Sequence, residues 1–240
     1  MQYRLDKLVC EVMGVSRADA KKLISKGLVK INGEIIKKAD RKADDSDDIV
    51  INGKSYTHEK FVYIMLNKPE GVVSASTDKN DVTVIDFVKD EFPRRNLFPA
   101  GRLDKTSTGF VLITDDGNFA HDILSPKHHV PKTYTVTVDS PVTPQVVKGF
   151  EEGVTLADGT LLKSAEIKPS PDGLTAQIIL HQGVYHQIKR MLGVYGIGVN
   201  TLHRTAIGKL EMPQDLQPGG YIKLNKKQVE MITADMFTEN

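Results

Sequence analysis

The chain has 240 residues, of which 40% are hydrophobic and 26% are charged, the balance of a globular protein with a real core. Its length accommodates one medium and one small domain. We find no apolar run near the roughly 20 residues that cross a bilayer, and the first residues lack a signal-peptide core. A single cysteine, Cys10, excludes an internal disulfide, and its apolar neighbours predict a small buried side chain. We therefore expect a cytoplasmic protein that does not contact a membrane.

Charge is unevenly distributed, although the formal net charge is only +1. Residues 1–42 contain 11 Lys and Arg against 5 Asp and Glu, whereas residues 43–59 contain 1 against 5. Residues 181–210 contain four Lys and Arg, three His and no carboxylate. Two separate basic regions favour phosphate-binding surfaces, and ordinary surface charge is an equally open interpretation. The acidic run at 44–48 lacks the glycine and distal glutamate of a calcium loop, so we expect a solvated turn and no metal.

The chain begins with a basic helical segment. Ser16 stands where an N-cap would start a helix over 17–24, and Gly27 supplies a C-terminal stop. Residues four apart on a helix share a face, so its cations form neighbouring stripes suited to a phosphate backbone. The expected RNA-binding set in this segment is Arg4, Arg17, Lys21, Lys22 and Lys26.

Two Asn-Gly pairs, Asn32-Gly33 and Asn52-Gly53, follow this helix between β-branched residues and predict tight hairpins. Arg4-Leu5-Asp6-Lys7, with the stretch from Ser16 to Gly33, resembles the S4 RNA-binding domain. The resemblance implies structured RNA as a partner. It does not name a reaction, because such modules occur in ribosomal proteins, tRNA synthetases, heat-shock proteins and modifying enzymes. We assign residues 1–58 to this module and residues 59–240 to a larger domain.

The larger domain interleaves strands and helices after a buried strand over 61–66. The alternation of Thr133-Tyr134-Thr135-Val136 is typical of an antiparallel strand with one solvated face. We expect further strands over 110–114, 132–139, 176–181, 201–210 and 221–224. We expect helices over 84–91, 118–124, 143–151, 185–195 and 227–236. The predicted fold class is α+β, a small S4-like module followed by a domain on a mixed, mainly antiparallel sheet.

The first candidate for chemistry is the stretch Phe98–Asp104. Pro and Gly interrupt regular structure there, so Arg102 and Asp104 should lie on a loop ahead of the strand 110–114. Functional side chains are common on loops that a rigid frame supports. Taken alone, an Arg-x-Asp pair on a loop is more typical of a structural turn.

Two later segments add to this loop. Alternation places Lys132 and Tyr134 on one face of their strand. The block Gly183–Leu192 predicts a helix in which Lys189 and Arg190 lie beside apolar residues. By itself, an amphipathic helix with solvated cations explains Arg190 well and the whole block less well.

Together the three segments resemble the pseudouridine synthase superfamily, in the RsuA-type branch that carries an N-terminal S4 domain. The stretch Gly101–Gly117 follows the signature of that branch almost throughout, with Phe110 and Asp115 where Leu and Asn are more common. His181-Gln182 stands where the branch commonly has an acidic residue. The block Tyr185–Leu192 most resembles the members that modify uridine 516 of bacterial 16S ribosomal RNA.

The resemblance implies a catalytic domain and a role for each candidate residue. Asp104 would act on the ribose of a flipped uridine, as nucleophile or as base at C2′. Lys189 would pair with Asp104 and keep it ionised in a partly desolvated pocket. Tyr134 would stack on the uracil and is a candidate for removing the C5 proton. The implied substrate-binding residues are Arg102, which would fill the gap left by the extruded nucleotide, Ile188 against the base, and His186 and Arg190 toward the RNA.

The implied reaction breaks the N1–C1′ bond and rejoins the uracil through C5, without redox change, so no cofactor is expected. The expected partner is ribosomal RNA, 16S favoured, or a small-subunit assembly intermediate, and a monomer is expected because no heptads occur. A 23S enzyme of the same branch and a non-catalytic S4 protein of ribosome assembly are alternatives. A glycosidase is a third, and it would need two carboxylates at a fixed separation.

Overall fold

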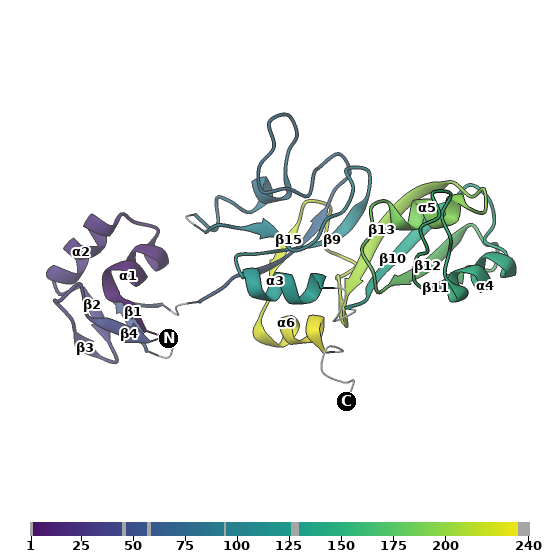
Figure 1. Ribbon diagram of the computed structural model, residues 1–240. Helices are drawn as coiled ribbons and strands as arrows, with labels where there is room; N and C mark the ends of the chain where they lie inside the picture. Colours follow the sequence, from purple (N-terminus) through teal and green to yellow (C-terminus); the bar gives the residue numbers. More distant parts are fainter. Residues whose placement is uncertain (1, 45–46, 57–58, 94, 126–129, 235–240) are drawn as a thin grey trace. The chain divides into compact units, whose positions relative to one another are not determined.

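The computed structural model describes residues 2–44, 47–56, 59–93, 95–125 and 130–234 (Figure 1). Two compact units divide the chain: Met1–Phe61 with Glu91–Asn96, and Val62–Asp90 with Leu97–Asn240. The segment Glu91–Asn96 belongs to the first unit because the Arg95 guanidinium donates hydrogen bonds to the carbonyls of Glu59 and Lys60. Across the described residues, no helix is long and apolar enough to cross a membrane.

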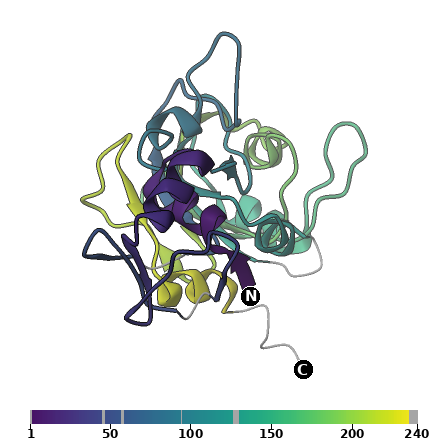
Figure 2. The same cartoon turned by 90° about the vertical axis from the view of Figure 1, so that its left-hand side faces the viewer.

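The first unit packs two helices on short strands. The helices α1 (Leu5–Met13) and α2 (Arg17–Ser25) lie side by side over the strands (Figure 2). As predicted, the Ser16 side chain caps α2 by accepting a hydrogen bond from the backbone N of Asp19 at 3.1 Å. The strands are β1 (Gln2–Arg4), which pairs with β4 (Lys42–Asp44), and a sheet in the order β3 (Glu34–Ile35), β2 (Val29–Ile31), β5 (Ile49–Ile51) and β6 (Lys54–Tyr56).

Both Asn-Gly hairpins form as predicted, with φ of 50° and 51° at Asn32 and Asn52 and larger positive values at the glycines. Helix α1 was not expected, although Leu5, Leu8 and Val9 are fully buried at helical spacing. Its start carries no capping side chain, since Arg4 at the N-cap makes no such hydrogen bond. The usual sequence signal for a helix start is therefore missing.

The second unit is built on a mixed sheet whose main path runs β11-β12-β10-β13-β9-β7-β15. Among the described strands, only β9 and β13 pair in parallel, so the mainly antiparallel α+β prediction is confirmed. The strands are β7 (Tyr63–Lys68), β8 (Phe98–Pro99), β9 (Thr108–Thr114), β10 (Lys132–Val138), β11 (Glu166–Pro169), β12 (Thr175–Leu180), β13 (Val199–Ile207), β14 (Leu210–Glu211) and β15 (Tyr221–Lys223).

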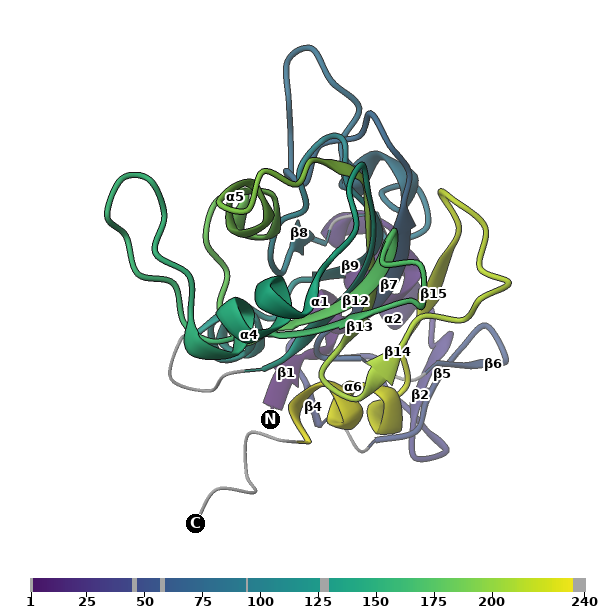
Figure 3. The same ribbon diagram turned by 90° about the vertical axis from the view of Figure 1, so that its right-hand side faces the viewer.

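Helices cover both faces of this sheet (Figure 3). On one face, Ile123 of α3 (Gly117–Leu124) and Ile232 of α6 (Lys226–Thr233) pack in a buried core with Phe110 and Leu112 of β9. Helix α5 lies over the opposite face (Figure 3). The helices of this unit are η1 (Val84–Phe87, a 3-10 helix), α3 (Gly117–Leu124), α4 (Pro144–Glu152), α5 (Gln187–Gly193) and α6 (Lys226–Thr233).

Three predicted elements need correction. The helix expected over 84–91 is only the short η1, because Val88 leaves the helical region with φ −123°. The helix expected from Tyr185 begins at Gln187, because His186 has a left-handed φ of 50°. The strand expected over 201–210 is divided into β13 and β14 by a turn at Gly208, whose φ is 58°.

The parallel contact between β9 and β13 joins the two halves of the sheet. Its register places Arg204 opposite Gly109, which has a φ of +100°. A Cβ atom on Gly109 would lie only 2.3 Å from the backbone O of Arg204 and 2.8 Å from its N. Any side chain here would therefore push the two strands apart.

We predict that Gly109→Ala lowers the free energy of unfolding by at least about 2 kcal/mol, measured by urea denaturation. Gly117→Ala is the matched control, because a Cβ at Gly117 meets nothing within 4 Å and the position is helical. That control should change stability by less than about 1 kcal/mol. Equal stability of the two variants would contradict the role given to the β9–β13 contact.

Candidate active site

A pocket of about 650 Å³ opens in the second unit beside α5, over β10 and β13. Asp104 is the one carboxylate among the residues that line it in the described part of the chain. Three lysines and two arginines share this lining with it. The lining includes these residues to which the sequence analysis gave a role: Arg102, Asp104, Tyr134, His186, Ile188 and Lys189.

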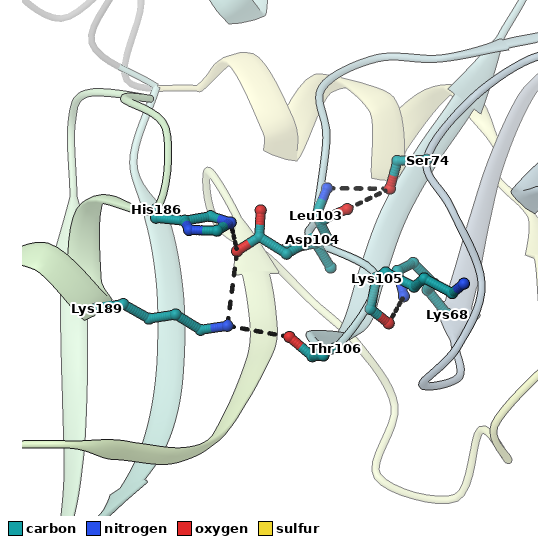
Figure 4. A network of polar contacts seen from close by, with 8 residues as sticks. All are labelled: Lys68, Ser74, Leu103, Asp104, Lys105, Thr106, His186 and Lys189. Carbon is teal, nitrogen blue, oxygen red and sulfur yellow. Dashed lines mark hydrogen bonds and ion pairs between the residues drawn. The ribbon is translucent and has the colours of Figure 1, made fainter.

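Asp104 lies on the loop between β8 and β9, as predicted, and the backbone on each side of it is fixed. The Ser74 hydroxyl donates to the O of Leu103 at 2.9 Å and accepts from its N at 3.0 Å (Figure 4). The backbone N of Ser107 donates to the O of Asp104 at 3.0 Å. The loop therefore holds the Asp104 carboxylate, 28% exposed, toward α5.

Two nitrogen-bearing side chains of the α5 region, His186 and Lys189, face this carboxylate (Figure 4). Nε2 of His186 lies 3.4 Å and Nζ of Lys189 lies 3.9 Å from Oδ2 of Asp104. Nζ of Lys189 also donates to Oγ1 of Thr106 at 3.0 Å. The structure thus brings together Asp104 and Lys189, and it adds His186 as the nearer nitrogen.

His186 is stacked on Tyr185, with ring centroids 3.8 Å apart and an angle of 17° between planes. Tyr185 is 68% exposed, so the stack runs from solvent to the Asp104 carboxylate. Tyr185 was not in the predicted set. The sequence analysis expected it only as the first residue of a helix, whereas it precedes α5 and lines the pocket.

Tyr134 is almost buried in the wall of the pocket, on the same strand as Lys132. An irregularity in the pairing of β10 with β13 occurs beside it, and its partner there is Arg204. Nζ of Lys132 donates to the carbonyls of Ile123 and Val130, at 3.3 and 2.8 Å. Burial, with the positive charge of Arg204 as a second cause, lowers the pKa of Lys132 to about 8.

The other two predicted substrate-binding cations differ in position. Arg102 is exposed and lines the pocket. Arg190 does not line it, because its guanidinium pairs with the carboxylate of Asp158 at 2.6 Å. The expected substrate contact of Arg190 is therefore not supported by its placement.

Lys68 was missed by the sequence reasoning. It is fully buried at the end of β7, and its Nζ donates to the O of Pro69 at 2.9 Å and of Lys105 at 3.3 Å (Figure 4). Lys105 follows Asp104 directly, so Lys68 helps to fix the loop that carries Asp104. Burial lowers the pKa of Lys68 to about 8, while the negative charges of Asp104 and Glu70 act to raise it. The available signal was a lysine at the end of a strand that contains Ile64-Met65-Leu66.

The five cations predicted to bind RNA are all exposed on the first unit. Arg4 pairs with the buried carboxylate of Asp6 at 3.1 Å, and Lys22 pairs with Asp19 at 3.2 Å.

The described residues contain no group of three His, Cys, Asp or Glu that could hold a metal ion. What the site presents is a carboxylate beside cations and an aromatic wall, an arrangement suited to a nucleotide.

Comparison with known sequences decides the family. The sequence model of RNA pseudouridylate synthases matches residues 62–193, more than half of the chain, and that of the S4 domain matches residues 4–50. The chain belongs to the RNA pseudouridylate synthase family. The predictions of an S4 domain and of a pseudouridine synthase, an isomerase, are thereby confirmed.

Relatives of this synthase match it over nearly their whole length. It is 37% identical to the ribosomal small subunit pseudouridine synthase A of Escherichia coli, covering 95% of this chain and 99% of the relative. It is also 37% identical to an uncharacterized RNA pseudouridine synthase of Bacillus subtilis, covering 95% and 98%. A crystal structure of a pseudouridylate synthase matches with a TM-score of 0.67, 37% identity, and coverage of 95% and 99%.

We predict a pH-dependent contribution of Lys68 to the stability of the synthase. The pKa of Lys68 falls from 10.5 to about 8 on folding, so between these values the unfolded chain binds more protons. Stability that depends on Lys68 must then rise with pH across this window. The unfolding free energy of wild type minus that of Lys68→Met should therefore increase from pH 8 to pH 10.

Lys226→Met is the control, because Lys226 is 92% exposed. Its difference from wild type should stay constant over the same pH range in urea titrations. A constant difference for Lys68→Met as well would show that Lys68 does not titrate as a buried lysine.

Proposed function

We propose that the chain isomerises uridine to pseudouridine in ribosomal RNA, with Asp104 as the reacting carboxylate. The observation that carries this proposal is that Asp104 is the one acid lining a pocket of cations and aromatic groups in the described structure. A glycosidase would need a second carboxylate in the same pocket. A non-catalytic S4 protein would not need the pocket.

The geometry supports the remaining roles that we propose. Lys189 and His186 would orient the Asp104 carboxylate toward the sugar, since both lie within 4 Å of its Oδ2. Tyr134 and Ile188 offer an aromatic and an apolar wall to the uracil. Exposed Arg102, at the same pocket, would fill the space left when the nucleotide leaves the stack.

Within ribosomal RNA we propose 16S RNA, at uridine 516, as the substrate, free or in a small-subunit assembly intermediate. Support comes from the name of the Escherichia coli relative and from the block Tyr185–Leu192. We propose the cytoplasm as its location, because bacterial ribosomal RNA matures there. We also propose that the protein is a monomer. The 23S enzymes of the branch are the competing assignment.

The S4 domain supplies the second part of RNA binding. Arg17, Lys21 and Lys26 are exposed on or beside α2, and no carboxylate is shown within ion-pair distance of them in the described structure. Such cations bind phosphates and release counterions when they do so. We therefore assign residues 1–58 to RNA docking and residues 59–240 to chemistry.

We predict that Asp104→Asn abolishes pseudouridine formation, a loss of more than about a thousandfold, because the amide can neither attack nor accept a proton. Tritium release from C5-tritiated uridine in a 16S transcript measures this loss. RNA affinity, measured by filter binding, should stay nearly unchanged. Asp215→Asn, at an exposed aspartate outside the pocket, should retain full turnover. Near-normal turnover by Asp104→Asn would remove Asp104 from the mechanism.

A further prediction concerns α2. Replacing both Lys21 and Lys26 with Gln should weaken RNA binding and reduce the slope of log affinity against log salt by about 1 to 2 units. The double replacement should leave single-turnover rates at saturating enzyme intact. Lys226→Gln, on the exposed face of α6, should leave the slope unchanged. An unchanged slope for the double variant would mean that α2 does not contact phosphates.

A further inference from the structure

Two buried polar atoms of the pocket walls lack a hydrogen-bond partner. Among the described residues, Nη2 of Arg204 and Oγ of Ser107 are the buried side-chain atoms without one. Both residues line the pocket. A buried donor without an acceptor costs about 1 to 3 kcal/mol, and more when it is charged. Two such atoms in the walls of one pocket favour a bound ligand that would supply their hydrogen-bond partners.

The Arg204 guanidinium is held in place from its other side. Its Nε donates to the O of Phe110 at 2.6 Å, across the β9–β13 contact. Its Cζ lies 6.0 Å from the ring centroid of Tyr134, the wall proposed to stack on uracil. Arg204 is only 3% exposed, so its position is fixed by packing before any substrate arrives.

Charge balance points the same way. Arg204 has no carboxylate within ion-pair distance in the described structure, and its neighbour Lys132 donates only to backbone carbonyls. The carboxylate of the pocket, Asp104, is paired instead with His186 and Lys189. An uncompensated buried cation is costly, and a ligand that brings negative charge would offset that cost.

We propose that Arg204 donates a hydrogen bond from Nη2 to a carbonyl oxygen of the flipped uracil and stabilises the negative charge that the ring acquires during the reaction. This inference rests on the proposed function. It makes Arg204 a catalytic residue that acts on the leaving group, opposite to Asp104, which acts on the sugar.

The electron balance requires such a group. When the N1–C1′ bond breaks, its electron pair stays on the uracil and spreads to O2 and O4. The sugar either forms a C1′–O bond to Asp104 or loses its C2′ proton to Asp104, and both routes release the same uracil anion. When C5 then bonds to C1′, the C1′–O bond to Asp104 breaks, or the proton held by Asp104 returns to C2′. The C5 proton leaves and N1 gains a proton, so Asp104 is regenerated and the product is an isomer. Arg204 would be most important while the ring is detached.

The test compares two RNAs with leaving groups of different strength. Fluorine at C5 withdraws electrons and makes uracil a better leaving group, so 5-fluorouridine should depend less on Arg204. Because its C5 carries fluorine and no proton, the ring keeps the fluorine after C5 bonds to C1′ and takes up water at C6. Single-turnover rearrangement is measured at saturating enzyme by nuclease digestion and chromatography of the nucleosides. Arg204→Gln should lower the rate of rearrangement of the uridine RNA about 100-fold. It should lower the rate for the 5-fluorouridine RNA by no more than about tenfold.

Arg204→Lys keeps the charge but not the forked donors, so it should lie between wild type and Arg204→Gln. It also supplies the same comparison if the Gln variant fails to fold, as judged by thermal unfolding. Thr201→Val is the control, on the same strand but exposed and outside the pocket, and should match wild type on both RNAs.

Equal losses on the two RNAs, or no loss on either, would overturn the inference, because a merely structural role does not depend on the leaving group. In that case wild type would still convert uridine, and the proposed function would stand. Absence of product from wild-type protein with both RNAs would instead reject the proposed function itself.

Discussion

The close parallel contact of β9 with β13 is the constraint on which the site depends. Gly109 permits it, because a Cβ atom there would overlap the backbone of Arg204. Asp104 lies five residues before Gly109 on one side of this contact, and α5 precedes β13 on the other. The contact therefore sets the distance between the carboxylate and the cations of α5. Sheet packing, rather than loop sequence alone, positions the groups that we propose to react.

Electrostatics explain why so many cations surround one acid. His186 and Lys189 face Asp104, while Lys132 and Arg204 lie in the wall without a carboxylate partner in the described structure. In the proposed reaction, the first pair lies beside the carboxylate that acts on the sugar. The second pair lies in the wall proposed to hold the uracil ring, which carries negative charge while it is detached from the sugar.

Much of the site could be predicted from sequence, because its residues lie in three ordered motifs. Asp104 and Lys189 were placed by resemblance, and the structure brings them within 3.9 Å. Arg204 and Lys68 could not be found in this way, since their importance follows from burial and missing partners, which only the folded chain shows. The left-handed backbone of His186 likewise has no local sequence signal, so Tyr185 was wrongly expected inside a helix.

The central claim is that this pocket converts a uridine of 16S ribosomal RNA. The most direct measurement is pseudouridine mapping of 16S and 23S RNA from a strain that lacks the gene, complemented with wild type or with Asp104→Asn. The account predicts loss of pseudouridine at a single 16S position, uridine 516, restored by wild type alone. Unchanged pseudouridine throughout both RNAs, or loss only in 23S RNA, would contradict it.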